Sequence, residues 1–99
     1  MKYQKQEIEA YLREYTTLQV CVVYGYDEDL SVAKVDLDNA IRKLQKSSPN
    51  LYKTIIGVFV YGNPIQEQAT QMDVSKRQIS RRLDDGVHML AMIMNGEVL

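Results

Sequence analysis

Residues 72–83 read Met72-Asp73-Val74-Ser75-Lys76-Arg77-Gln78-Ile79-Ser80-Arg81-Arg82-Leu83. Ser75 and Gln78 have the spacing of a capping box, in which each side chain accepts the backbone amide proton of the other residue. Ile79 and Leu83 then fall on one face of the helix that follows. The segment therefore predicts a helix that begins directly after Ser75.

A shorter helix is predicted immediately before this turn. Pro64 is suited to the start of a helix, since it lacks the amide proton that would have no partner there. Two helices that cross steeply need a small residue where they approach and apolar side chains between them. Ala69 is the small residue, and the apolar contacts come from Met72, Val74, Ile79 and Leu83. Residues 64–94 are therefore predicted to form a helix-turn-helix.

The second helix of this motif is expected to present a basic surface to DNA. The candidate DNA-binding residues are Ser75, Lys76, Arg77, Ser80, Arg81 and Arg82. Helix-turn-helix proteins place this part of the helix in the major groove, and arginine can donate two hydrogen bonds to a guanine edge. We assign base contacts to Arg77 and Arg81, assisted by Ser80, and phosphate contacts to Lys76 and Arg82. Asp84 and Asp85 repel phosphate, so the DNA face should end there.

Residues 72–83 resemble the helix-turn-helix of region 4 of bacterial sigma factors, which has an apolar-Gly-Val-Ser turn and an Arg-Leu pair. The similarity extends back through Pro49, the helix it begins, Gly62 and Pro64. Small proteins of this build resemble the ArpU and RinA type of phage and prophage late-gene regulators.

Two residues depart from the family pattern. Asp73 replaces the glycine of the turn, which aspartate can do because it tolerates the left-handed conformation. Gln68 stands where an apolar residue is usual, so we expect shallower packing or a shifted register there.

The rest of the chain is predicted to be helical, which makes the fold class all-α. A buried helix is expected over residues 51–61, with a strand over 54–61 as the rival interpretation; Ser48 should cap it and Gly62 close it. A helix over residues 30–46 should turn inward Val32, Val35, Leu37, Ile41 and Leu44. An N-terminal helix begins near Tyr3, and whether residues 16–26 are helix or strand stays open. We divide the chain into an N-terminal helix and linker, 1–28, and a helical domain, 29–99.

Composition limits the function to a few classes. The formal net charge is −1, so a DNA-binding role depends on local positive charge. No apolar run has the roughly 20 residues of a membrane span, which predicts a cytoplasmic protein. No phosphate loop, metal-ligand pair or activated nucleophile is present, so we expect no enzyme, no catalytic residue, no metal and no cofactor.

Two functions remain in competition. We favour a sequence-specific transcription regulator that binds double-stranded DNA, with the tyrosines of the N-terminal quarter available for a homodimer. The alternative is an interaction module that binds RNA polymerase or another protein, with little direct DNA binding. Its contacts would come from the basic helix or from the methionines at residues 89–94, which otherwise pack on the core.

Overall fold

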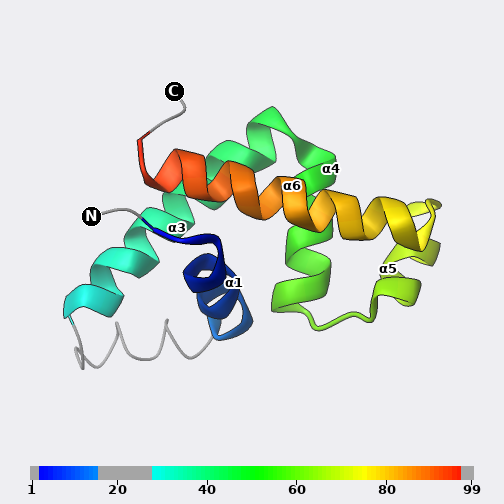
Figure 1. Ribbon diagram of the computed structural model, residues 1–99, viewed down its shortest axis with the longest axis horizontal. Helices are drawn as coiled ribbons and strands as arrows, with labels where there is room; N and C mark the ends of the chain where they lie inside the picture. The colour runs from blue at the N-terminus through cyan, green and yellow to red at the C-terminus, as the bar shows by residue number, and fades with distance from the viewer. Residues whose placement is uncertain (1–2, 16–27, 97–99) are drawn as a thin grey trace.

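The computed structural model describes residues 3–15 and 28–96, and these residues contain helices and no strand (Figure 1). The elements are α1 (Lys5–Arg13), α3 (Glu28–Ser47), α4 (Pro49–Ile55), the π-helical turn η1 (Ile56–Val60), α5 (Ile65–Met72) and α6 (Lys76–Met94). The predicted all-α fold is confirmed for this part of the chain. The open question of residues 16–26 lies outside the described residues. Within them, no helix combines the length and the hydropathy that crossing a bilayer requires.

Helix α6 is the central element. Figure 1 shows it running across α3 and α4, with α1 alongside and α5 at its N-terminal end, and it contacts all four of these helices. The largest fully buried apolar side chains come from α1, α3, α4 and α6 and are Ile8, Leu12, Leu37, Leu44, Ile55, Ile79, Val87 and Leu90. Met89, Ile93 and Met94 are half-buried against this core, as the packing interpretation of the C-terminal methionines predicted.

Gly86 allows α6 to approach α4 closely. A Cβ atom at this position would lie 2.7 Å from Cγ1 and 2.9 Å from Cδ1 of Ile55, which is 1% exposed. Real Cβ atoms do not come this close to another carbon, so a side chain at residue 86 would push the two helices apart. The crossing of α4 and α6 therefore depends on a glycine in the middle of a long helix.

The N-terminal helix shares the core of the helix-turn-helix. Ile8 and Leu12 of α1 are both 0% exposed and belong to the same cluster as the α6 side chains. Tyr3, two residues before α1, is joined to the C-terminal end of α6 by a reciprocal pair of hydrogen bonds. The Tyr3 amide donates to Asn95 Oδ1 (2.6 Å), and Asn95 Nδ2 donates to the Tyr3 carbonyl (3.1 Å).

Two tyrosines next to α3 carry a pH dependence. Burial and a hydrogen bond to Asp36 (2.7 Å) raise the pKa of Tyr3 to about 12, and burial with a hydrogen bond to Asp38 raises the pKa of Tyr15. Between pH 10 and about 12, folded Tyr3 keeps a proton that an unfolded tyrosine loses. Its contribution to stability should therefore be complete below pH 10 and lost as the pH rises toward 12.

We expect Tyr3→Phe to reduce the alkaline loss of stability. The measurement is urea unfolding at steps between about pH 8 and pH 12, compared with the unsubstituted chain. Tyr61→Phe is the control, because Tyr61 is 75% exposed. An equal alkaline slope in Tyr3→Phe and the unsubstituted chain would show that Asp36 does not hold the phenol.

The inward face of α3 differs from the prediction. Leu37, Ile41 and Leu44 are buried as expected, but Val32 is 57% and Val35 54% exposed. The buried stripe also includes Ala33 and Ala40, whose spacing with Leu37 and Leu44 is that of one helix face. Val32 and Val35 lie about 100° or more from the middle of that face, since each residue turns the helix by about 100°. The prediction that Val32 and Val35 face inward is therefore wrong. It gave the two valines more weight than Ala33 and Ala40, because valine is the larger apolar residue.

The helix after Pro49 confirms the helical interpretation of residues 51–61 over the strand. It runs from Pro49 to Ile55 as α4 and continues as η1, where the Tyr61 amide donates to the Ile56 carbonyl five residues back (3.0 Å). Gly62 closes it in the left-handed region, with φ of 73°. Ser48 occupies the N-cap position, but its side chain makes no capping hydrogen bond, so that capping prediction is wrong.

Candidate nucleic-acid interface

The turn between α5 and α6 is closed by a left-handed aspartate. Asp73 has φ of 56° and ψ of 48°, the conformation that its place in the turn was expected to require. The Val74 amide donates to the Ala69 carbonyl (3.0 Å) and the Asp73 amide to the Thr70 carbonyl (3.2 Å). These bonds pair carbonyl groups that the end of α5 leaves without a helical partner. The chain then reverses toward α6 within three residues.

The start of α6 is fixed by the predicted capping box. The Gln78 amide donates to Ser75 Oγ (3.1 Å), and the Ser75 amide donates to Gln78 Oε1 (3.4 Å). Helix α6 accordingly begins at Lys76. The cap satisfies backbone groups at the N-terminal end of the helix that carries the basic residues, so it fixes the residue at which that helix begins.

Ser75→Ala should lower the free energy of unfolding by about 1 kcal/mol, because the Gln78 amide would lose its acceptor. The measurement is urea unfolding followed by circular dichroism. Ser80→Ala is the matched control, since Ser80 is an exposed serine on the same helix and makes no side-chain hydrogen bond in the described structure. Equal stability of the two variants would contradict the role of the cap.

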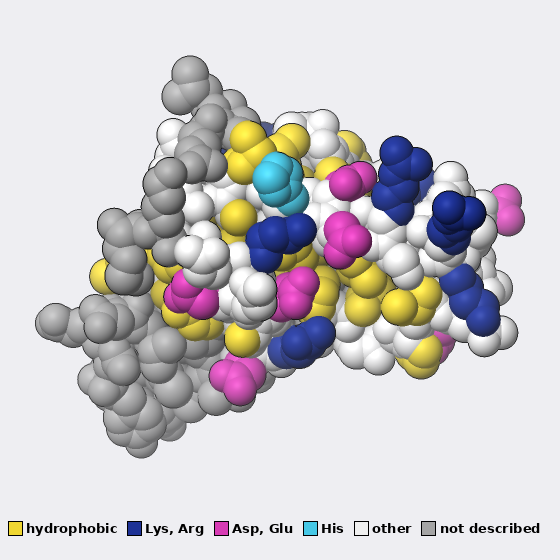
Figure 2. All heavy atoms as spheres, in the orientation of Figure 1, with side chains coloured by type: hydrophobic (Ala, Val, Ile, Leu, Met, Phe, Trp, Pro, Cys, Tyr) yellow, Lys and Arg dark blue, Asp and Glu magenta, His cyan; other side chains and the backbone are white. Residues whose placement is uncertain are grey.

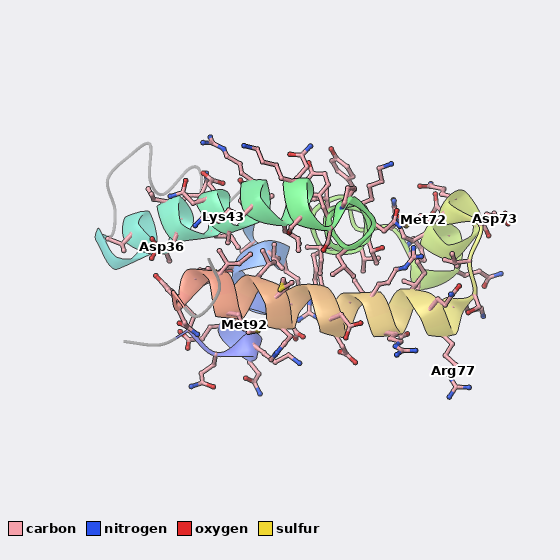
Figure 3. All side chains as sticks on the ribbon, turned by 90° about the horizontal axis from the view of Figure 1, so that it is seen from above. Asp36, Lys43, Met72, Asp73, Arg77 and Met92 are labelled. Carbon is pink, nitrogen blue, oxygen red and sulfur yellow. The ribbon has the colours of Figure 1, made fainter. Side chains whose placement is uncertain are left out.

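The helix-turn-helix packs around the predicted apolar contacts. Ile79 is 0% and Ala69 4% exposed, whereas Met72, Val74 and Leu83 are half-buried. Figure 3 shows Met72 between α5 and α4, and Asp73 at the tip of the turn. With Ile79 inward, the opposite side of α6 is left to solvent.

The candidate residues are brought together at one end of the molecule. Lys76, Arg77, Ser80 and Arg81 are exposed, and Arg82 is half-buried. At about 100° per residue, Arg77, Ser80 and Arg81 share one arc of the helix, with Lys76 and Arg82 on its two flanks. We call these five residues the cationic arc. Figure 2 shows Lys and Arg side chains gathered at this end, and Figure 3 shows Arg77 pointing away from the body of the protein.

The charges of the cationic arc are available to a ligand. None of its four cations forms an ion pair with any described residue. The exposed carboxylates Asp84 and Asp85 follow one turn later on the same helix. Positive potential is therefore concentrated in the first two turns of α6 and decreases along the helix, which suits an anionic surface that approaches the end of α6.

The shallower packing expected at Gln68 is not observed, and that part of the prediction is wrong. The Gln68 side chain is 4% exposed, so α5 packs deeply at this position and not shallowly. The physical reason is Gly57 in η1, which has no side chain to occupy the space that the Gln68 amide fills. Sequence reasoning did not connect Gly57 with Gln68. A glycine inside an apolar helix, opposite an unexpected polar residue, was the available signal.

A metal site is not assembled among the described residues. No three His, Cys, Asp or Glu side chains among them come together in a way that could hold a metal ion. His88 is exposed on α6, beyond the two aspartates. The cationic arc is therefore the feature of the described structure that best fits a ligand.

A family model describing ECF sigma factors matches residues 4–86, from the residue before α1 to the glycine at the α4–α6 crossing. The chain belongs to the ECF sigma factor family. This confirms the resemblance of the helix-turn-helix to sigma region 4 at the level of the family, and it indicates a role connected with transcription. Comparisons with curated proteins and with solved structures found no match.

Proposed function

We propose that this ECF-family chain is a sequence-specific transcription regulator that binds duplex DNA through the cationic arc. The observation that carries the proposal is the arrangement of four cations on two turns of a helix whose start is fixed by a capping box. Arg77 and Arg81 lie on the outermost arc, where a helix inserted into the major groove meets base edges. Lys76 and Arg82 lie on the flanks, which face the two phosphate backbones.

The type of regulator to which this chain is related is proposed from its sequence alone. The build of the chain, with an N-terminal helix before a helix-turn-helix like that of sigma region 4, resembles the ArpU and RinA type of late-gene regulators, so we propose a phage or prophage origin. We also propose a cytoplasmic site of action, where a DNA-binding regulator meets its target. A homodimer on two half-sites would double the contacts of a small motif. Sedimentation of the protein with a selected DNA fragment gives the stoichiometry directly.

The experiment that tests the function is selection of genomic fragments by the purified protein, followed by footprinting and a salt titration. Each phosphate neutralised on B-DNA contributes about −0.9 to the slope of log affinity against log salt. The two phosphate contacts assigned to Lys76 and Arg82 therefore predict a slope of roughly −2 for each bound protein chain. Failure to enrich any fragment, or an affinity that salt does not change, would reject DNA binding.

Arg81→Ala should weaken binding to the selected fragment by about 5- to 150-fold, the equivalent of roughly 1 to 3 kcal/mol, and relax the preference at one base pair. Arg82→Ala should weaken all fragments alike and reduce the salt slope by about one. Competition binding with fragments substituted at single base pairs separates these results. If Arg81→Ala kept full affinity and specificity, its assignment as a base contact would be wrong.

A second candidate function is binding of RNA polymerase or another protein. The observation that favours it is a hollow of about 350 Å³ between α4–η1 and α5, which is lined by Tyr52, Ile56, Tyr61 and Met72 among others. Tyr61 is 75% exposed at this hollow. Protein binding there would vary little with salt, in contrast to DNA binding by the cationic arc.

A further inference from the structure

Helix α5 carries a buried polar side chain, that of Gln68, which makes hydrogen bonds to α4, to the connection before α5 and to α5 itself. Gln68 Oε1 accepts from Asn63 Nδ2 (3.0 Å), and Gln68 Nε2 donates to the Lys53 carbonyl (3.2 Å). Its second amide proton faces Met72 Sδ (3.3 Å). No buried side-chain nitrogen or oxygen in the described residues lacks a partner, so this amide is satisfied although it is 4% exposed.

The space for this amide is made by a residue of the π-helical turn. A Cβ atom on Gly57 would lie 2.2 Å from Gln68 Oε1 and 2.5 Å from its Cδ and Nε2 atoms. The Asn63 amide donates to the Gly57 carbonyl (3.0 Å), while the Asn63 side chain holds Gln68. Gly57, Asn63 and Gln68 thus join the π-helical turn, the connection and α5. We call these three residues the amide lock.

The amide lock differs in kind from the other contacts of α5. Burial of apolar surface is non-directional, so it stabilises α5 against its neighbours without fixing the angle of the helix closely. Hydrogen bonds to a planar amide have strict geometry, and a buried network that is fully satisfied favours one arrangement. Because α5 has eight residues and is joined to α6 by the tight turn at Asp73, any rotation of α5 also moves the start of α6.

We propose that Gln68 is a positioning residue, which through the amide lock sets the orientation of the helix-turn-helix and so the aim of the cationic arc. The inference rests on the proposed DNA-binding function and adds a residue that DNA does not touch. The lock holds α5 to η1 in one register. An apolar residue at position 68 keeps α5 packed but lets the helix-turn-helix adopt several orientations, of which one fits the groove.

Gln68→Met is the first test, because methionine is unbranched and close in size to glutamine. We expect the variant to keep its far-UV circular dichroism spectrum and a cooperative thermal transition, and to lose about tenfold in affinity for the selected fragment. The matched control is Gln71→Met, an exposed glutamine on the same helix. Residual dipolar couplings of residues 65–72 relative to α4 measure the orientation itself. In Gln68→Met these couplings should decrease and no longer fit the same alignment as those of α4, whereas in Gln71→Met they should stay unchanged.

A rescue experiment separates positioning from stability. Gly57→Ala should lower the thermal midpoint, since its methyl group displaces the Gln68 amide. Adding Gln68→Ala removes the clash, so the double variant should regain part of the thermal midpoint while its DNA affinity stays low. Recovery of stability and affinity together would overturn the proposal, as would wild-type couplings and affinity in Gln68→Met. If the unsubstituted chain selects no DNA fragment, the proposed function fails, whereas the couplings still confirm or refute the orienting role.

Discussion

Reversal of both outer charges, by Arg77→Glu together with Arg81→Glu, is expected to abolish specific DNA binding at physiological salt. Two bidentate base contacts together correspond to roughly 2 to 6 kcal/mol of discrimination. The new carboxylates would also repel phosphate in a region that already ends at Asp84 and Asp85. We expect a loss of affinity of at least about a hundredfold, measured by fluorescence anisotropy with the selected fragment.

The fold should survive this double reversal, because Arg77 and Arg81 are exposed and form no ion pair with any described residue. Lys43→Glu with Lys46→Glu is the matched control. It changes the net charge by the same amount, and both lysines are exposed on α3. Figure 3 shows Lys43 away from the start of α6. A similar loss of affinity in both double variants would mean that total charge, and not the cationic arc, governs binding.

Gly86→Val is expected to cause a large loss of stability. The added side chain has to displace Ile55, which is 1% exposed and whose Cγ1 would lie 2.7 Å from a Cβ atom at residue 86. Overpacking of a filled core costs typically about 1 to 3 kcal/mol, and the valine branch occupies more space than a single methyl group. We expect the thermal midpoint to fall by at least about 10 °C, since 1 kcal/mol corresponds to about 4 to 8 °C in a domain of this size.

The control for this prediction is the effect of Gly86→Ala on stability, which should have opposite signs in two backgrounds. In the unsubstituted chain, Gly86→Ala should destabilise, because even one methyl group meets the Ile55 side chain. In an Ile55→Ala background the same substitution should stabilise, because alanine favours a helix over glycine by about 1 kcal/mol. Equal effects in the two backgrounds, measured by urea unfolding, would show that the glycine is not required for the crossing of α4 and α6.

The features predicted correctly from sequence are those that neighbouring residues specify. The capping box of Ser75 and Gln78, the left-handed Asp73 and the break at Gly62 each depend on a few consecutive residues, so their chemistry can be read along the chain. The exposure of the basic residues follows from the same local pattern, once Ile79 faces inward. The position of most of the candidate site was therefore predictable.

The features that were missed depend on pairs of residues far apart in the sequence. Gly86 meets Ile55, and Gly57 meets Gln68, only after three helices have packed, so neither glycine had a visible partner in the sequence. The orientation of α3 was missed for a related reason. Its apolar residues cover more than one face, and the packing of neighbouring helices selects the face with Leu37 and Leu44 over the one with Val32 and Val35.

Because α6 crosses α4 closely at Gly86, a tilt of α6 about this crossing moves both of its ends. Arg77 lies nine residues from that crossing, about 13 Å along a helix that rises 1.5 Å per residue. A tilt of about 10° at the crossing would move the Arg77 backbone by roughly 2 Å. A donor–acceptor distance that increases by this amount no longer corresponds to a hydrogen bond. The other end of α6 is followed by Asn95, which holds the start of the N-terminal segment through Tyr3. If the proposed DNA-binding function holds, a partner that displaced this segment would tilt α6 and change the position of Arg77 relative to a base, without contacting the DNA itself.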